Sequence, residues 1–303
     1  MKKTDSILMN RFVSRALTIA IGLCAGYLPT AAEPVRIVGS DLLGDQVETV
    51  LRQTAEDLEV SIQVGLTGSR PGWDALSQNY GDIAVLLRGP SSRNLPESWS
   101  ALPLGYLTAY VVVSERLRID QLNFSQLTAI FADESSTVAS RWTDFGARGE
   151  SSGWQVRPHI TGPSQGISHE LFLHTVPSRP RLKNTVRAHD SVTDTLTAIL
   201  AQDGGIAIVP RIPAEATGVK ALLLAPSSEA VAFSPTAENI RAGDYPLRIE
   251  LTLVFRTTEG PELKKWLRLW YSEAMRAAFE AGGVVPLPAG VRGQQDFALE
   301  QLR

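Results

Sequence analysis

The sequence predicts an α/β protein with a two-lobed fold and a central ligand cleft. Short apolar runs typical of strands alternate with stretches of helical periodicity from residue 35 onward, which is the pattern of βαβ units around a parallel sheet. The pattern changes after Ser114, and a second series of strands and helices follows over 156–209. In open α/β sheets ligands bind beyond the carboxyl ends of the strands, so the loops at those ends should carry the function.

The first lobe contains two predicted βα units in sequence order. Its elements are a strand at 35–38, a helix at 42–58, a strand at 60–64, a helix at 72–78 and a strand at 82–87. A longer strand-like run at 106–113 precedes the crossing to the second lobe. We therefore expect lobe 1 to consist of residues 33–113 and 215–303, and lobe 2 of residues 114–214.

The end of the chain should return to the first lobe. Residues 248–255 alternate apolar and polar side chains, as a half-buried strand does, and 261–282 reads as one strongly amphipathic helix. Trp266 and Trp270 form an aromatic stripe at helical spacing on this helix. We interpret the stripe as part of the core rather than as a groove for a partner.

Residues 1–32 have the features of a secretory signal peptide. Four basic side chains precede an apolar run at 16–28, and small residues follow at 31–32. The run is too short for the roughly 20 residues that a membrane-spanning helix needs. Cys24 could suggest a lipid anchor, but Leu23 stands where such signals have a small residue. We expect cleavage after Ala32 and a periplasmic protein without disulfides, because Cys24 is the only cysteine.

Composition and motifs exclude several function classes. The formal net charge is −3 with no block of basic residues, which disfavours nucleic-acid binding. The sequence has no Gly-Lys-Ser/Thr phosphate loop and no Gly-x-Gly-x-x-Gly dinucleotide motif, so we expect no nucleotide cofactor. A hydrophobic content of 44% is typical of a chain that folds around a core.

Three predicted loops share one design, in which a strand leads through a short Gly/Ser/Thr segment into a helix. These loops are 39–41, 67–72 and 161–166. Glycine lets the backbone approach a ligand closely, and the amides of a helix N-terminus attract anions. Ser40, Ser69 and Ser164 can equally be ordinary helix caps. Asp82 and Arg88 flank the strand at 82–87, where each could contact a ligand or belong to a surface ion pair.

The order of these motifs resembles the phosphate-binding proteins of bacterial ABC transporters. The motifs that carry the resemblance are Gly39-Ser40, Thr67-Gly68-Ser69, Gly81-Asp82-Ile83-Ala84, Trp142-Thr143-Asp144, Ser164-Gln165-Gly166, Tyr245-Pro246-Leu247 and Gly283-Val284-Val285-Pro286-Leu287. The resemblance implies a type II periplasmic-binding-protein fold. It also implies a monomer that captures a small inorganic oxyanion, such as phosphate, and presents it to a membrane permease.

The resemblance also implies which residues contact the anion. They would be Ser40, Asp41, Ser69, Asp82, Ser164, Gln165 and Gly166. The third loop departs from the family because it lacks an arginine before the loop and a threonine after it. Charged hydrogen bonds are worth about 1.5–3 kcal/mol each, so their loss would weaken binding. Arg70 could replace the missing cation, and Arg88 is the second candidate.

Two other readings of the sequence are weaker. Gly162-Pro163-Ser164-Gln165-Gly166 fits the Gly-x-Ser-x-Gly pattern of a hydrolase, but no separated acid and histidine follow it, so we expect no enzyme. His169 and His174 are five residues apart and point to different helix faces, which disfavours a metal site. The alternative that remains open is a binding-protein-like domain with a sensory or protein-interaction role and no tight phosphate binding.

Overall fold

A computed structural model describes residues 33–89, 92–132, 140–162, 168–175 and 181–302. The predicted signal peptide and the Ser164-Gln165-Gly166 motif lie outside these ranges. Residues 33–303 form one compact unit. Within the described ranges, none of the helices has the length and apolar character needed to span a bilayer.

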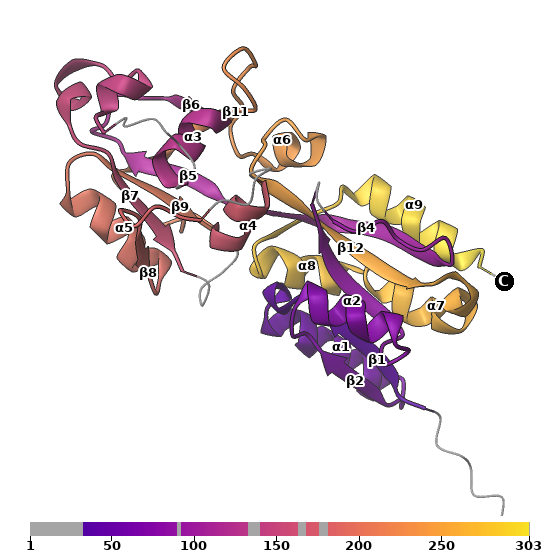
Figure 1. Ribbon diagram of the computed structural model, residues 1–303. Helices are drawn as coiled ribbons and strands as arrows, with labels where there is room; N and C mark the ends of the chain where they lie inside the picture. The colour runs from indigo at the N-terminus through magenta and orange to yellow at the C-terminus, as the bar shows by residue number, and fades with distance from the viewer. Residues whose placement is uncertain (1–32, 90–91, 133–139, 163–167, 176–180, 303) are drawn as a thin grey trace, which may run out of the picture. The chain divides into compact units, whose positions relative to one another are not determined.

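The first sheet has six strands in the order β13-β4-β12-β3-β1-β2 (Figure 1). β1 (Val35–Gly39), β2 (Ile62–Gly65) and β3 (Ile83–Arg88) run parallel, and β12 (Arg248–Arg256) runs antiparallel to β3. β4 (Trp99–Thr108) and β13 (Val284–Pro286) complete the sheet. The predicted βαβ opening is therefore confirmed.

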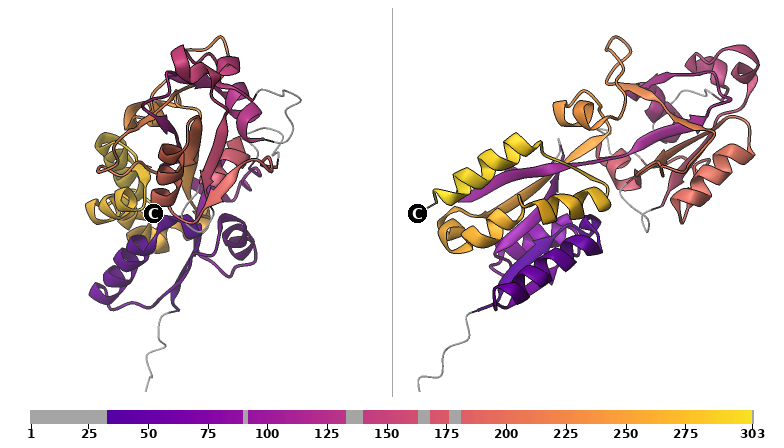
Figure 2. Two further views of the ribbon diagram at one scale, coloured as in Figure 1. Left: turned by 90° about the vertical axis from the view of Figure 1, so that its left-hand side faces the viewer. Right: turned by 180° about the vertical axis from the view of Figure 1, so that it is seen from behind.

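Helices α1 (Asp45–Asp57) and α2 (Ser69–Ser77) cover opposite faces of the parallel strands (Figure 2). Ile83 and Val85 of β3 pack in the same apolar cluster as the buried face of α1. Ala84 and Leu86 pack instead with Leu76 of α2. This division follows from the strand geometry, in which successive side chains point to opposite faces.

The C-terminal part of the chain contains three helices, α7 (Gly260–Leu269), α8 (Glu273–Ala281) and α9 (Ala289–Glu300). The expected single helix at 261–282 is thus divided, because the Ser272 side chain caps a new helix by accepting a hydrogen bond from the Met275 amide. Trp266 and Trp270 are both buried, which confirms that the aromatic stripe belongs to the core.

The second sheet has five strands in the order β10-β5-β9-β7-β8. They are β5 (Tyr110–Ser114), β7 (Arg157–Thr161), β8 (Arg187–His189), β9 (Gly205–Val209) and β10 (Val219–Ala221). Helix α5 (Val192–Ala201) packs on one face with Ala207 and Val209, while the buried side chains of α4 (Ser168–Thr175) pack with Ile206 and Ile208 on the other.

Smaller elements connect and extend the sheets. β6 (Gln121–Asn123) and β11 (Leu223–Ala225) form a two-stranded sheet beside α3 (Phe124–Phe131), and α6 (Ala237–Ala242) follows β11. Short 3₁₀ helices lie at Asp41–Leu43 (η1), Trp142–Phe145 (η2), Gly149–Gly153 (η3) and Thr257–Glu259 (η5).

The chain passes between the two large sheets around Ala109. The run expected as one strand at 106–113 is divided there, because the Ala109 amide donates to the Leu247 carbonyl and its own carbonyl accepts from the Tyr245 hydroxyl. The chain therefore crosses from the first sheet to the second at Ala109, five residues before Ser114, near which the crossing was expected. The chain returns to the first sheet between β11 and β12, later than residue 215, where the return was expected. Each large sheet with its helices forms one lobe of the α/β fold.

Candidate functional site

The carboxyl ends of β1, β2 and β3 bring two of the three predicted loops together. Because these neighbouring strands are parallel, Ser40 after β1, Ser69 after β2 and Arg88 at the end of β3 lie at the same edge of the sheet. The Ser40 amide donates to the Val85 carbonyl at 2.8 Å, and the Leu87 amide donates to Ser69 Oγ at 2.9 Å. Both loops are thus anchored to β3.

Two glycines make this close arrangement possible. Gly39 has a φ of +139°, and a Cβ there would lie 2.1 Å from the Val85 carbonyl oxygen. A Cβ on Gly72 would lie 2.6 Å from the Cα of Gly39. The start of α2 therefore rests directly on the end of β1.

Ser40 is completely buried and caps η1. Its Oγ accepts a hydrogen bond from the Leu42 amide at 3.2 Å, and the residue that follows, Asp41, is exposed. The longer helix α1 begins only at Asp45, after Gly44, so the expected helix start at residue 42 is wrong. The ordinary cap interpretation applies to Ser40.

Ser69 has a different role, because the cap position of α2 is Gly68 and Ser69 is the first helical residue. Its hydroxyl oxygen accepts from the Leu87 amide, which ties the helix start to β3. The Ser69 and Arg70 amides belong to the first turn, where backbone N–H groups have no acceptor within the helix. A hydroxyl that already accepts still has a proton to donate.

The two candidate arginines have unlike surroundings. Arg70 is exposed. Arg88 is partly buried, and its Nη1 is inaccessible to solvent without a hydrogen-bond partner among the described residues. By strand alternation Arg88 shares the sheet face of Ala84 and Leu86, which α2 covers. Of the two cations, Arg70 is an exposed residue of the first turn of α2, whereas Arg88 is a partly buried residue at the end of β3.

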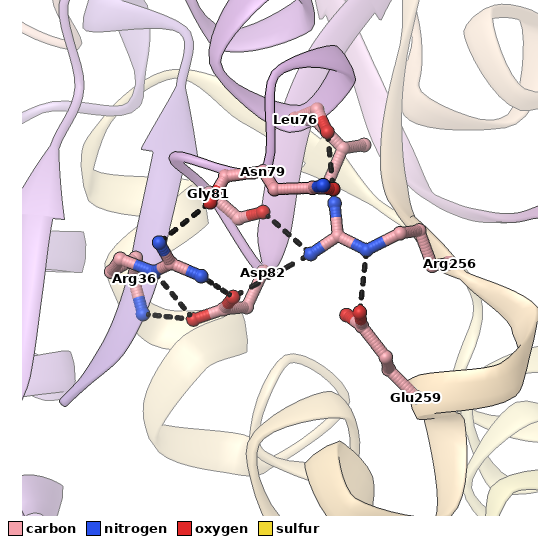
Figure 3. A network of polar contacts seen from close by, with 7 residues as sticks. All are labelled: Arg36, Leu76, Asn79, Gly81, Asp82, Arg256 and Glu259. Carbon is pink, nitrogen blue, oxygen red and sulfur yellow. Dashed lines mark hydrogen bonds and ion pairs between the residues drawn. The ribbon is translucent and has the colours of Figure 1, made fainter. Parts of the chain in front are cut away.

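Asp82 lies at the other edge of the sheet. It directly precedes β3, whereas Ser40 and Ser69 follow the strands that they terminate. Its carboxylate accepts hydrogen bonds from Arg36 through the backbone amide (2.8 Å), Nε (3.1 Å) and Nη2 (2.5 Å). Figure 3 shows this pairing. Asp82, which was expected among the anion contacts, has as its partners Arg36 and, at 3.6 Å, Arg256.

The surroundings of Asp82 favour its ionised form. Burial alone would raise the pKa of the carboxyl group, but the hydrogen bonds from the Arg36 side chain and backbone, with the charges of Arg36 and Arg256, hold the pKa below its ordinary value. Arg256 also donates to the carbonyls of Leu76 and Gly81, so the network fixes the end of α2 (Figure 3). Asp82 is a structural residue.

The third loop can be followed only at its ends. Ser164, Gln165 and Gly166 lie outside the described residues, as do the side chains of His169 and His174. Before the loop, Thr161 is buried and its hydroxyl bonds to that of Thr195 at 3.0 Å. After it, α4 begins at the buried Ser168. Within the described part of the chain no three His, Cys, Asp or Glu side chains gather as metal ligands would.

No protein-family model matches the sequence, and no curated protein matches it either. Solved structures do share its fold. An ABC-type phosphate transport receptor from Vibrio cholerae has a TM-score of 0.68 at 17% identity, covering 84% of this chain and 100% of its own. A possible phosphate binding protein from Planctomyces limnophilus has a TM-score of 0.71 at 16% identity, with coverages of 89% and 98%.

PstS from Borrelia burgdorferi gives a TM-score of 0.68 at 16% identity, covering 84% of this chain and 99% of that one. These similarities extend over 84–89% of this chain and nearly the whole length of the three solved structures. The predicted two-lobed type II periplasmic-binding-protein fold is thereby confirmed, and in its fold the chain resembles the phosphate receptors of ABC transporters.

Proposed function

We propose that this chain is an exported solute-binding protein that captures a small oxyanion, with phosphate as the first candidate, for an ABC importer. The observation that carries the proposal is the meeting of the Ser40 loop, the start of α2 and Arg88 at one sheet edge. Its fold is also that of proteins named as phosphate receptors. The expected signal peptide remains part of this proposal, as does the division into two lobes, with the boundaries moved to Ala109 and to the segment between β11 and β12.

Each group at the edge would have a defined task. Ser69 would donate its hydroxyl proton to the anion, together with the first-turn amides of α2, and Arg88 would supply the positive charge. Ser40, being buried, would hold the loop in place rather than contact the anion. The third loop, with Ser164, Gln165 and Gly166, would contribute from lobe 2. The protein would bind and release its solute without making or breaking a covalent bond.

One alternative has its own support. The burial of Ser40 and the pairing of Asp82 with Arg36 give both residues structural roles. A binding-protein-like domain that serves as a sensory or interaction module, without tight phosphate binding, would keep such residues for its fold alone.

Calorimetry on the purified protein separates the two proposals. Phosphate, sulfate and molybdate are titrated into wild type, Arg88→Gln and the control Arg93→Gln, which changes an exposed arginine of the loop after β3. Solute binding predicts heat with at least one anion and an affinity at least about tenfold lower for Arg88→Gln, because a charged hydrogen bond is lost. Arg93→Gln should bind like wild type. The absence of heat with all three anions would support the interaction module.

A further inference from the structure

Two histidines form a stacked pair within the second lobe. His159 on β7 and His189 on β8 are connected by a hydrogen bond of 2.9 Å between Nδ1 of His159 and Nε2 of His189. Their rings stack with centroids 5.1 Å apart and planes 25° from parallel. His159 is 1% exposed, and its Nε2 has no hydrogen-bond partner among the described residues. Neither histidine has a role in the proposed anion site.

The pair bridges the outermost strand of the sheet to its neighbour. β8 has three residues and pairs only with β7 in the strand order β10-β5-β9-β7-β8. The Gly162 amide, directly after β7, donates to the His189 carbonyl at 2.8 Å. Such a short edge strand has few ladder hydrogen bonds, so a side-chain contact contributes a large share of what holds it in place.

The charges around His159 are mostly positive. Arg157 lies on its own strand, and Arg187 is its register partner on β8. β9, on the other side of β7, has no charged residue, and the only one in α5 is Asp194, which accepts a hydrogen bond from the Ser191 hydroxyl at 2.7 Å. Burial first, and then the charges of His189, Arg187 and Arg157, lower the pKa of His159 to about 4.

The hydrogen bond between the rings requires one nitrogen that accepts. A neutral imidazole has one donor and one acceptor nitrogen, whereas the protonated ring has two donors. When both rings are protonated, Nδ1 of His159 and Nε2 of His189 both carry protons and repel. We infer that the His159–His189 pair is an acid-sensitive latch that holds β8 on the edge of the second sheet.

The direction and size of the effect follow from proton linkage. With β8 detached, His159 would be hydrated and would titrate near the ordinary value of 6.5, whereas the attached form takes its proton only near pH 4. The neutral His159 thus stabilises the attachment of β8 to β7 fully above about pH 6.5. This stabilisation decreases as the pH falls, and it decreases no further below about pH 4. The equilibrium constant for opening β8 should rise up to about tenfold per pH unit in that window.

Hydrogen exchange of the full-length protein, followed by mass spectrometry, tests the latch between pH 7.5 and pH 4.5. Protection of the peptide that contains 187–189, corrected for the intrinsic exchange rate, should fall by more than tenfold on acidification, while β9 remains protected. In His159→Leu, which removes the ring whose proton uptake is linked to opening, the protection should depend much less on pH. His189→Gln leaves His159 buried and removes only one of the lesser causes of its lowered pKa, so the pH dependence of this variant should be reduced but not abolished. His169→Gln and His174→Gln serve as controls and should behave like wild type.

Two hydrogen-exchange results would overturn the inference. One is wild-type protection of β8 that is the same at pH 7.5 and pH 4.5 after correction. The other is an acid-dependent loss that persists unchanged in both His189→Gln and His159→Leu. If a variant fails to fold, ring ¹⁵N spectra of the wild type decide the question. Spectra that show His159 protonated at pH 4.5, while the 187–189 peptide keeps its pH 7.5 protection, would also contradict the latch.

Discussion

Replacing Asp82 by Asn tests whether the Asp82 carboxylate stabilises the fold or contacts the anion. The Asp82 side chain is 16% exposed and that of Arg36 is 31% exposed. The substitution removes the charge from the three hydrogen bonds that Arg36 donates, and it places an amide NH₂ among them. Removing one partner from a fully buried ion pair costs about 3–5 kcal/mol, and exposed pairs are worth about 0–1 kcal/mol.

Since this pair lies between those limits, we expect a loss of about 2 kcal/mol of unfolding free energy. For a chain of this size that corresponds to a fall of about 4–8 °C in Tm. The matched control is Glu48→Gln, which breaks an exposed pair with Arg52 of the same 2.5 Å length. This control should change the unfolding free energy by less than about 0.5 kcal/mol.

The acid side of the stability profile should change as well. The pKa of Asp82 is lowered in the folded protein, so the pair stabilises the fold above the ordinary value of 3.8 and the contribution is lost as the pH falls through the lowered value. That part of the acid dependence should be absent in Asp82→Asn.

Thermal unfolding measures the stability of each variant, and calorimetry with phosphate and sulfate measures its anion affinity in the same samples. Affinity and selectivity for these anions should match wild type, because Asp82 lies at the sheet edge opposite Ser40. A variant that keeps its Tm but changes phosphate affinity tenfold or more would refute this reasoning and return Asp82 to the anion site.

Three further substitutions test the carboxyl edge of the sheet. Gly72→Ala should destabilise the fold by about 3 kcal/mol or more in chemical denaturation, because its Cβ would lie 2.6 Å from the Gly39 Cα. Ser40→Ala should cost about 1 kcal/mol for the lost cap, measured by the same denaturation, and should leave anion affinity within threefold of wild type. Arg70→Ala should weaken anion binding in calorimetry by less than Arg88→Gln does, because Arg70 is exposed and its charge is screened; a larger loss for Arg70→Ala would make Arg70 the cation of the site.

The sequence predicts the strands and helices of the first lobe well because their signals are local. The continuous apolar run at 83–87 and the Gly/Ser/Thr loops mark where strands end and helices begin. The same local signals grouped Asp82 with the residues at the carboxyl ends of the strands, although Asp82 precedes β3 and lies at its amino end. Strand direction, combined with the rule that ligands bind at carboxyl ends, puts Asp82 at the edge opposite the proposed site.

The remaining features depend on contacts between distant segments. The division of the strand-like run at Ala109 requires Tyr245 and Leu247, which no local pattern reveals. His159 and His189 meet because β7 and β8 pair with His159 opposite Arg187 and Thr161 opposite His189. A register shifted by one residue would turn His189 to the other face, so the pair could not be predicted without the sheet.

The two edges of the same three parallel strands differ in their chemistry, and this difference favours the carboxyl edge as the anion site. At the amino edge, Arg36 and Arg256 face Asp82, and Arg256 is also paired with Glu259, so positive charge is already neutralised (Figure 3). At the carboxyl edge, the first-turn amides of α2 carry partial positive charge, and Arg88 Nη1 has no hydrogen-bond partner among the described residues. An anion at the carboxyl edge would find positive groups without a paired carboxylate in the described part of the chain, whereas at the amino edge it would have to displace one.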